Sequence, residues 1–284
     1  MTDHTINMVA ATAVAAPLTL SVVTPVYNRQ DVMHTSLRSS LQLVQSGIAT
    51  ELVVVDDGST DHSVLEIETQ YADFISSGQL KLITLQKNGG VSAAKNAGAA
   101  AASGDWIIFM DSDDWFVAGA VQQMLMQIRQ HQDCAVLFFR CQDQLKAELI
   151  GRPMTAQLLT IRQMINNGTP GECLPVVKRS SILRHPYPAE LRGSEGLSYL
   201  AMLNSGQTIF LSELIVREYQ DSAENRLSSP TGLRKRSPYL VRHNLRLLRY
   251  WKFATVATLA GWCLRIGYYS FWSLQQFLQR HLVR

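Results

Sequence analysis

Residues 104–114 read Gly-Asp-Trp-Ile-Ile-Phe-Met-Asp-Ser-Asp-Asp, an apolar run followed at once by carboxylates. The apolar part, Trp106–Met110, is long enough for one buried strand. Alternate residues at a strand end point the same way, so Asp111 and Asp113 can face one pocket. Such oxygen ligands suit Mn²⁺ or Mg²⁺, which can hold a diphosphate at the same time. The stretch therefore predicts a divalent-metal site, although an Asp-x-Asp pattern alone is common in surface loops.

The surrounding sequence alternates short apolar runs with helical segments. The runs predict buried strands at Leu18–Val26, Glu51–Val55, Leu80–Leu85, Trp106–Met110 and Ala135–Phe139. Helical spacing predicts helices at Asp31–Gln45, from a Thr60 or Asp61 cap to Tyr71, at Val91–Ala102 and at Val117–His131. This alternation is typical of βαβ units, so we expect an α/β fold with a mainly parallel sheet covered by helices on both faces.

Polar clusters follow three of the predicted strands, at Tyr27-Asn28, at Asp56-Asp57-Gly58 and at Asp111–Asp114. Ligands bind beyond the carboxyl ends of the strands in such sheets. Turn formation explains Gly58, but it does not explain several carboxylates at adjacent strand ends. Clustered carboxylates repel one another unless a cation lies between them. The clusters therefore predict one ligand site at this edge.

Four motifs in order resemble those of family 2 glycosyltransferases, which have a GT-A fold. They are Val22-Val-Thr-Pro-Val-Tyr-Asn28, Val53-Val-Val-Asp-Asp-Gly-Ser-Thr-Asp61, Asn88-Gly-Gly-Val-Ser-Ala-Ala-Lys-Asn-Ala-Gly98 and the stretch 104–114. The resemblance is clear over residues 18–115 and continues more faintly to residue 220. It implies an inverting, metal-dependent transfer of a sugar from a nucleotide-sugar donor.

The resemblance assigns the donor site to Pro25, Tyr27, Asp56, Asp57, Gly90, Lys95, Asp111 and Ser112. Pro25 and Tyr27 would line the base pocket. Asp56, with Asp57 beside it, would accept a hydrogen bond from the base imide, which favours UDP- or dTDP-sugars.

The same resemblance implies roles for the loop and helix that follow. Gly90 would allow a close backbone approach, and Lys95 would contact the nucleotide. The alternative for Lys95 is a solvated helix residue. Asp111 would reach the ribose or the metal, and Asp113 would ligate Mn²⁺ or Mg²⁺. The metal would neutralise the charge that develops on the leaving diphosphate.

The expected catalytic base is where the chain departs from the family pattern. Family members have Glu-Asp at the start of a helix, whereas this chain has Glu195 followed by Gly196. Ser194 is a predicted N-cap for that helix, and the helix N-terminus favours an ionised carboxylate. We expect Glu195 to be the base, with Glu190 as the alternative.

The C-terminal part carries a strong basic excess. Residues 1–230 hold 16 Lys and Arg against 23 Asp and Glu, whereas residues 231–284 hold 10 Lys and Arg and no acid. Aromatic side chains are interleaved with these cations, which predicts amphipathic helices lying on an anionic membrane. Arg265 argues against a transmembrane span. A helical hairpin packed on the catalytic domain is the alternative, and nucleic-acid binding is not expected.

The predicted organisation has three parts. Residues 1–17 form a flexible tail, 18–225 the GT-A domain, and 226–284 the basic amphipathic helical region. The N-terminus lacks the features of a signal peptide, and the four scattered cysteines predict reduced thiols. We therefore expect a cytoplasmic protein bound peripherally to the inner face of the cell membrane.

The expected function is transfer of one sugar to a glycan or polyprenyl-diphosphate-linked acceptor in surface polysaccharide biosynthesis. A Gln-x-x-Arg-Trp element, typical of processive members, is not visible, so polymer synthesis is not expected. Two alternatives stay open: a non-catalytic nucleotide-sugar-binding protein, because of Gly196, and a sugar nucleotidyltransferase with a similar sheet.

Overall fold

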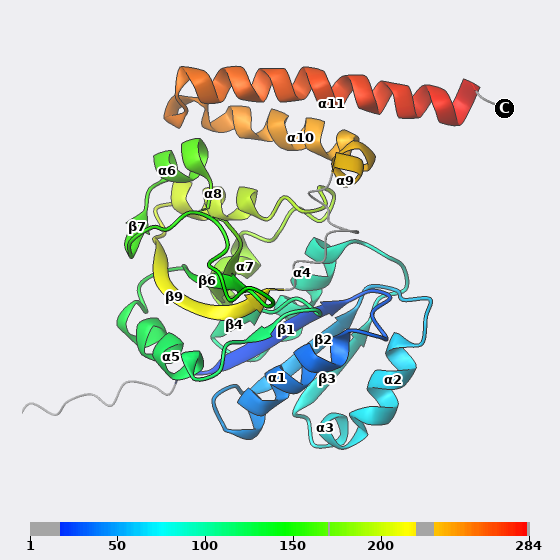
Figure 1. The fold of residues 1–284 in the computed structure, drawn as a ribbon, viewed down its shortest axis with the longest axis vertical. Coiled ribbons are helices and arrows are strands. Elements are labelled where there is room, and N and C mark those ends of the chain that lie inside the picture. The colour runs from blue at the N-terminus through cyan, green and yellow to red at the C-terminus, as the bar shows by residue number, and fades with distance from the viewer. Residues whose placement is uncertain (1–17, 170, 220–229, 283–284) are drawn as a thin grey trace, which may run out of the picture.

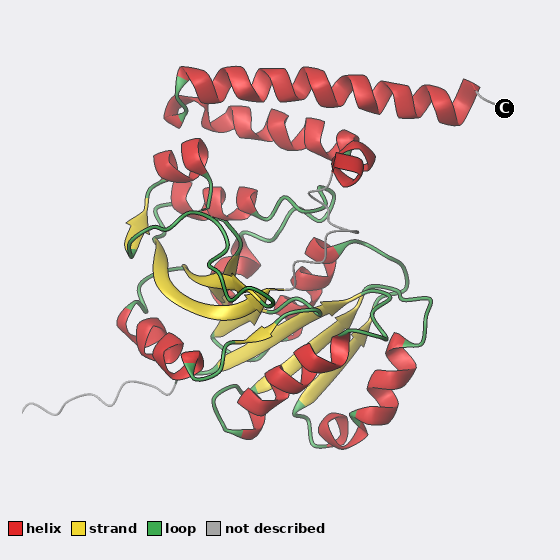
Figure 2. Ribbon diagram, viewed as in Figure 1, coloured by secondary structure: helices red, strands yellow, loops and turns green. Residues whose placement is uncertain are grey.

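The computed structural model describes residues 18–169, 171–219 and 230–282. The predicted N-terminal tail, residues 1–17, lies outside the described residues. One mixed, curled sheet forms the centre, and helices cover both of its faces (Figures 1 and 2). The predicted α/β class with a mainly parallel sheet is confirmed.

The first half of the sheet is parallel and matches the predicted strands. Its members are β3 (Leu80–Thr84), β2 (Glu51–Asp56), β1 (Leu20–Val26) and β4 (Trp106–Phe109), in that spatial order. β1 pairs with both β2 and β4, and β2 pairs with β3. The carboxyl ends of β1, β2 and β4 therefore lie next to one another.

The second half of the sheet is mixed and was mostly not predicted. It contains β8 (Cys173–Lys178), β6 (Val136–Asp143), β9 (Ile209–Tyr219), β5 (Trp115–Phe116) and β7 (Gln157–Leu159). β8 runs antiparallel between β4 and β6, and β6 is parallel to β9. β9 also pairs with both short strands, β5 and β7. These partners are far apart in sequence, so no local pattern indicates them.

Residues of the central strands alternate between two buried layers. In β2, Leu52 and Val54 belong to one core, while Val53 and Val55 belong to the other. Both sides are apolar because helices cover both faces, as expected for parallel strands. The first face carries α1 (Met33–Gln45), α2 (Ser63–Gln70), α3 (Ala72–Ser76) and α5 (Ala120–Gln130).

The second face carries α4 (Val91–Ala101), α6 (Ile161–Asn167), α7 (Arg179–Arg184) and α8 (Gly196–Asn204). Helix α4 lies very close to β1, because a Cβ on Gly98 would sit 2.3 Å from Val23 Cγ1. Only glycine fits there. This close packing places the N-terminus of α4 beside the strand ends.

Four predicted helix starts differ from the structure. α1 begins at Met33 rather than Asp31. α5 begins at Ala120 rather than Val117, because Trp115–Phe116 pair with β9 first. α2 begins at Ser63, and Asp61 Oδ1 accepts a hydrogen bond from its backbone N–H at 3.0 Å. Ser194 as the N-cap of α8 is wrong, because Glu195 occupies that position.

The C-terminal segment folds as a helical hairpin. It consists of α9 (Pro230–Lys235), α10 (Ser237–Leu247), the 3-10 helix η2 (Leu248–Phe253) and α11 (Val256–Leu282). α10 and α11 lie side by side above the second face of the sheet (Figure 1). Trp262 anchors the hairpin in the second core. The packed hairpin considered as an alternative is therefore present. Within the described ranges, no helix combines the length and apolar character needed to cross a membrane.

A buried carboxylate ties three segments together beneath the sheet. Glu51 Oε1 accepts hydrogen bonds from Ser21 Oγ at 2.8 Å and from Ser103 N and Oγ at 2.6 Å. Its Oε2 lies 2.8 Å from Lys81 Nζ. Burial alone would raise the pKa of Glu51, but these partners lower it to about 2 from an ordinary 4.5.

This lowered pKa predicts acid-dependent stability. A group with a lowered pKa in the folded state stabilises the fold above its unfolded pKa. We expect the free energy of unfolding to fall as pH drops from 4.5 towards 2, and Glu51→Gln to flatten this dependence in urea unfolding. Glu68→Gln, at an exposed position, is the control. An unchanged slope in Glu51→Gln would contradict the assignment.

Candidate active site

The candidate site lies at the carboxyl ends of β1, β2 and β4, beside the N-terminus of α4. Pro25 is buried in β1, and Tyr27 just beyond it is 43% exposed. The next residue, Asn28, has a φ of 50°, and its Oδ1 accepts a hydrogen bond from Thr60 N at 2.8 Å. The structure thus brings the first two motifs together at one edge.

Asp56 ends β2 and is fully buried. Its Oδ2 accepts hydrogen bonds from Gly58 N at 3.1 Å and Ser59 N at 3.0 Å. Its Oδ1 is buried and has no hydrogen-bond partner among the described residues. A buried acceptor without a donor is unfavourable, so this oxygen is an observation that a ligand would explain.

Asp57 has a different environment. Its Oδ1 accepts a hydrogen bond from Gly89 N at 2.8 Å, and its Oδ2 accepts one from Gly90 N at 2.7 Å. Gly90 has a φ of 90°, which favours glycine. Both oxygens of Asp57 are engaged, so the side chain holds this loop rather than facing a base directly.

Asp111 lies between two cations. Lys95 Nζ is 2.9 Å from Asp111 Oδ1, and Arg217 Nη1 is 3.3 Å from Asp111 Oδ2. Burial would raise the pKa of Asp111, but Lys95 and Arg217 hold it below its ordinary value. Lys95 is 12% exposed, so it is not a solvated helix residue.

Asp113 differs electrostatically from Asp111. Burial and the nearby Asp111 carboxylate raise the pKa of Asp113 above its ordinary value. The guanidinium of Arg29 offsets this only in part, at 3.7 Å from Asp113 Oδ2. Ser112 is buried between the two aspartates. Asp113 is therefore the carboxylate of this motif that most needs a further cation.

Arg217 on β9 is a site residue that the sequence analysis missed. It is 2% exposed, and it lies 3.3 Å from both Asp111 Oδ2 and Asp114 Oδ2. Its Nε contacts Cys141 Sγ at 3.1 Å. Burial would lower the pKa of Arg217, but these partners raise it. One pattern could have indicated it: an arginine after the apolar run 214–216 is costly in a strand unless it is paired.

Glu195 faces the same region from the start of α8. Its Oε1 accepts a hydrogen bond from Ser92 Oγ at 2.8 Å, and Ser92 lies in the first turn of α4. Burial would lower the pKa of Lys95, but the Asp111 and Glu195 carboxylates together raise it. Glu195 is thus close to the ion-paired cluster. Glu190, the alternative base, is 54% exposed and pairs with Arg246.

The carboxylates fit a divalent cation only together with a substrate. No cluster of three or more His, Cys, Asp or Glu suited to a metal occurs in the part of the chain that the structure describes. Mg²⁺ is often bound by one or two carboxylates plus substrate phosphates. Asp113 fits such a role, and Asp111 fits it less well because both of its oxygens have cationic partners.

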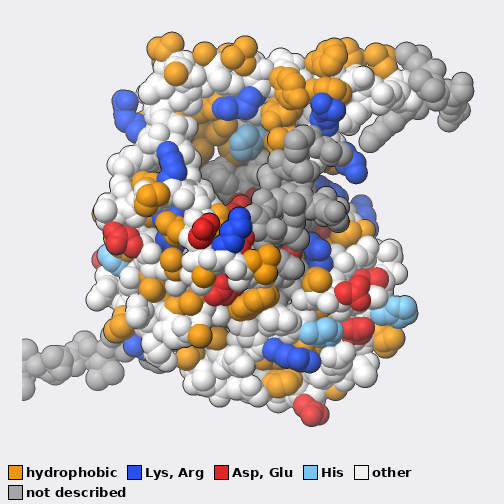
Figure 3. Space-filling view, in the orientation of Figure 1, with side chains coloured by type: hydrophobic (Ala, Val, Ile, Leu, Met, Phe, Trp, Pro, Cys, Tyr) orange, Lys and Arg blue, Asp and Glu red, His pale blue; other side chains and the backbone are white. Residues whose placement is uncertain are grey.

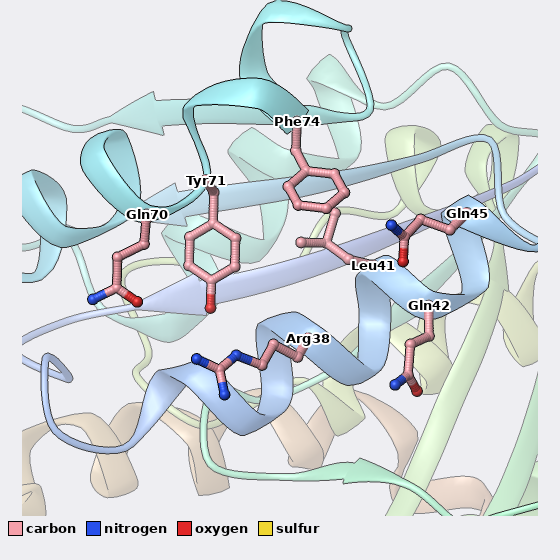
Figure 4. Close-up of a pocket in the computed structure, with 7 residues that line it drawn as sticks. All are labelled: Arg38, Leu41, Gln42, Gln45, Gln70, Tyr71 and Phe74. Atoms are coloured by element: carbon pink, nitrogen blue, oxygen red, sulfur yellow. The ribbon is translucent and has the colours of Figure 1, made fainter.

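A pocket of about 300 Å³ lies elsewhere, between α1 and α2–α3 (Figure 4). It is lined by Arg38, Leu41, Gln42, Gln45, Gln70, Tyr71 and Phe74. The Tyr71 side chain points across the pocket towards α1. None of the predicted site residues lines it, so it is a gap between helices rather than part of the candidate site.

The profile of the family described as "Glycosyl transferase family 2" matches residues 21–178, more than half of the chain. This chain belongs to glycosyl transferase family 2. The match includes the three strand ends and the loop that form most of the site. The suspected resemblance is therefore confirmed.

Similar proteins are known from several bacteria. A Bacillus subtilis protein described as "Putative teichuronic acid biosynthesis glycosyltransferase TuaG" is 25% identical over 253 residues, 86% of this chain and 92% of that protein. An uncharacterized glycosyltransferase of Haemophilus influenzae is 37% identical over 106 residues, 37% of this chain and 40% of the relative. The succinoglycan biosynthesis protein ExoO of Rhizobium meliloti is 34% identical over 37% of this chain and 28% of its own. The chain thus spans less than half of the latter two.

Solved structures support the fold. Residues 1–349 of TarS from S. aureus, in complex with UDP-GlcNAc, align with a TM-score of 0.60 and 19% identity. The alignment covers 89% of this chain and 80% of the TarS chain. A second crystal structure of TarS residues 1–349 aligns with a TM-score of 0.58 and 20% identity. The predicted GT-A fold is therefore confirmed.

The raised pKa of Asp113 predicts a trade between stability and function. Above that pKa the partly buried Asp113 carboxylate is ionised beside Asp111, which destabilises the metal-free fold. We expect Asp113→Asn to raise the thermal midpoint by about 2–4 °C at pH 8 in chelator, measured by calorimetry. Asp133→Asn, at an exposed position, should leave it unchanged. A lower midpoint in Asp113→Asn would show that the carboxylate stabilises the fold.

Proposed function

We propose that this protein is a glycosyltransferase that moves one sugar from a nucleotide-sugar donor to a glycan during surface polysaccharide biosynthesis. The observation that carries the proposal is the juxtaposition of Asp56, Asp111 and Asp113 at one sheet edge within residues matched by the family 2 profile. Family membership supports the reaction class, and the buried Asp56 with the partly exposed Asp111 and Asp113 supplies suitable donor-site chemistry.

The donor is a UDP- or dTDP-sugar in this proposal. Asp56 Oδ1 is a buried acceptor without a partner among the described residues, and the N–H of a uracil or thymine imide would satisfy it. Tyr27, exposed at the same edge, offers a ring for the base. The structural likeness to a protein crystallised with UDP-GlcNAc is consistent with this donor class.

Asp113, assisted by Asp111, would hold Mn²⁺ or Mg²⁺. The metal would neutralise the charge that develops on the leaving diphosphate. Lys95 and Arg217 keep Asp111 ionised and fixed in position. Lys95, on the second turn of α4, also offers a cation to a nucleotide phosphate.

Glu195 is the proposed base. It would take the proton of the acceptor hydroxyl as that oxygen attacks the anomeric carbon, in one inverting displacement. Ser92 orients the carboxylate through the 2.8 Å hydrogen bond. A Cβ placed on Gly196 would meet no atom within 4 Å. No other functional group therefore occupies the place of the aspartate that the family pattern has there.

The acceptor is proposed to be a lipid-linked glycan at the cytoplasmic face of a membrane. Relatives described by teichuronic acid and succinoglycan biosynthesis support a polysaccharide setting. One observation favours a second candidate: Gly196 stands where the family has its base. A non-catalytic nucleotide-sugar-binding protein would be the outcome if Glu195 cannot replace it.

Sugar transfer by the purified protein tests the proposal. We expect Mn²⁺- or Mg²⁺-dependent release of UDP or dTDP from one donor of a panel, with lipid extract as acceptor. Glu195→Gln should bind that donor with unchanged affinity but lower turnover at least 100-fold, because a base is removed. Asp113→Asn should lose the metal-dependent reaction although its fold is preserved.

The matched control is Glu68→Gln, which makes the same chemical change on an exposed helix position. Normal turnover by Glu195→Gln would exclude Glu195 as the base. Donor binding without turnover across all acceptors would instead favour the binding-protein candidate.

The membrane partner is proposed from the outer face of α11. Exposed apolar residues recur at helical spacing along it: Leu264, Tyr268, Phe271, Leu274 and Leu278. Hydrophobic side chains gather there in Figure 3. Residues 231–284 carry ten cations and no acid, which complements an anionic lipid surface. The apolar face and the charge together support peripheral binding through this region.

Vesicle flotation tests this partner. We expect the protein to float with vesicles that contain phosphatidylglycerol, less with phosphatidylcholine alone, and less at high salt. Leu264→Glu combined with Phe271→Glu should abolish flotation. Leu65→Glu with Leu183→Glu changes two exposed leucines of the catalytic part and should have no effect. Equal flotation of both double variants would contradict the assignment.

A further inference from the structure

The segment that carries the proposed base contacts the Asn88 loop and α4 on one side and the C-terminal hairpin on the other. We call residues 190–195 the base segment; it is the second part of the connection from α7 to α8. On the nucleotide side, Arg192 Nη2 donates a hydrogen bond to Asn88 Oδ1 at 2.7 Å. Glu195 accepts one from Ser92 on the same side. These contacts join the base segment to the loop and helix of the donor half.

The hairpin contacts the opposite side of the base segment. Arg236, the residue between α9 and α10, donates from Nη2 to the backbone carbonyls of Arg192 and Gly193. A Cβ on Gly193 would lie 2.5 Å from this nitrogen, and Gly193 has a φ of 71°. The positive φ favours glycine here, and the missing side chain lets the guanidinium lie against the turn.

Two further hairpin side chains contact the same segment. His243 Nδ1 lies 3.0 Å from Ser194 Oγ, and Arg246 pairs with Glu190. Arg236, His243 and Arg246 thus contact residues on both sides of Leu191, which is itself buried. These polar contacts of Arg236 and α10 converge on the base segment, a stretch of six residues that ends in Glu195.

These contacts differ from general packing of the hairpin. The apolar anchor of the hairpin, Trp262, lies on α11 and belongs to the second core. The far end of the hairpin makes polar contacts with Asn166 on α6, through Thr255 and Thr258. The polar contacts of Arg236 and α10 with the rest of the protein instead meet backbone carbonyls, a hydroxyl and a carboxylate of the base segment. In the part of the chain that the structure describes, no side chain caps the start of α8 by a hydrogen bond. The hairpin contacts therefore supply order that helix capping does not.

We propose that Arg236 is a positioning residue: it fixes the turn at Arg192 and Gly193 and thereby sets where the Glu195 carboxylate lies. The inference rests on the proposed function, in which Glu195 is the base. It also links the membrane-facing hairpin to the reacting groups, because α10 connects Arg236 to the rest of the hairpin.

The loop at Gly89 and Gly90 does not depend on the contacts that Arg236 makes with the base segment. Asp57 holds Gly89 and Gly90 through its own hydrogen bonds. Loss of Arg236 should therefore change turnover and leave donor binding intact. A residue that only stabilised the fold would lower the amount of active enzyme, and a residue that bound the donor would raise its KM.

Steady-state kinetics of the full chain tests the inference. We expect Arg236→Gln to lower kcat, expressed per donor-binding enzyme molecule, at least 10-fold with donor KM within twofold of wild type. Arg236→Lys should recover part of kcat, because an ammonium can still donate to one carbonyl. Arg129→Gln makes the same change at an exposed site on α5 and should behave as wild type. A kcat within twofold of wild type for Arg236→Gln, or a rise in donor KM alone, would overturn the proposal.

Two further measurements keep the test decisive. If Arg236→Gln does not fold, Ser194→Ala provides a second test, because it removes the hydroxyl that contacts His243. It should lower kcat about threefold with donor KM unchanged. An unchanged kcat would count against positioning of Glu195 by the hairpin. Hydrogen exchange separates this inference from the proposed function. Even if the wild type transfers no sugar, the amides of residues 191–196 should exchange faster in Arg236→Gln than in Arg129→Gln. Equal exchange in the two variants would overturn the proposal that Arg236 orders this segment.

Discussion

Two cations around Asp111, the buried Arg217 and the mostly buried Lys95, determine how the site is built. Lys95 comes from the helix after β3, and Arg217 comes from the last strand of the sheet. A guanidinium buried like that of Arg217 is tolerated only with carboxylate partners, and alone it would be strongly unfavourable. The two halves of the sheet must therefore meet at Asp111. Burial and the neighbouring Asp111 carboxylate raise the pKa of Asp113, and Arg29 and Arg217 offset this only in part.

Local patterns were sufficient to predict the first half of the fold. Each of β1 to β4 is a short apolar run whose alternate residues enter different cores. A helical crossover follows each of the first three strands in the chain, so the strands pair in parallel. The second half could not be predicted in this way. β9 pairs with β6, β5 and β7 across long sequence separations, and β5 has only two residues. Such pairings depend on the three-dimensional path of the chain.

The candidate site was predictable to the same extent. Asp56, Lys95, Asp111 and Asp113 lie where their motifs placed them, because each follows directly from a strand end or a helix start. The distinction between Asp56 and Asp57 was not predictable, since it depends on which carboxylate meets the amides of Gly89 and Gly90. The role of Ser194 was missed for a similar reason. Its hydroxyl meets His243, which is distant in sequence and belongs to the hairpin.

The loop held by Asp57 has a consequence for the thermodynamics of binding. Gly89 and Gly90 are the residues whose unfixed backbones would lose most conformational entropy on ordering. In this protein the Asp57 carboxylate orders both glycines through two hydrogen bonds. The close approach of Gly58 to Asn88 further restricts the loop. A nucleotide that meets this loop finds it preorganised, so little of the interaction energy is lost in fixing the backbone. Affinity can then come from few contacts, and a small ligand can be released quickly after reaction.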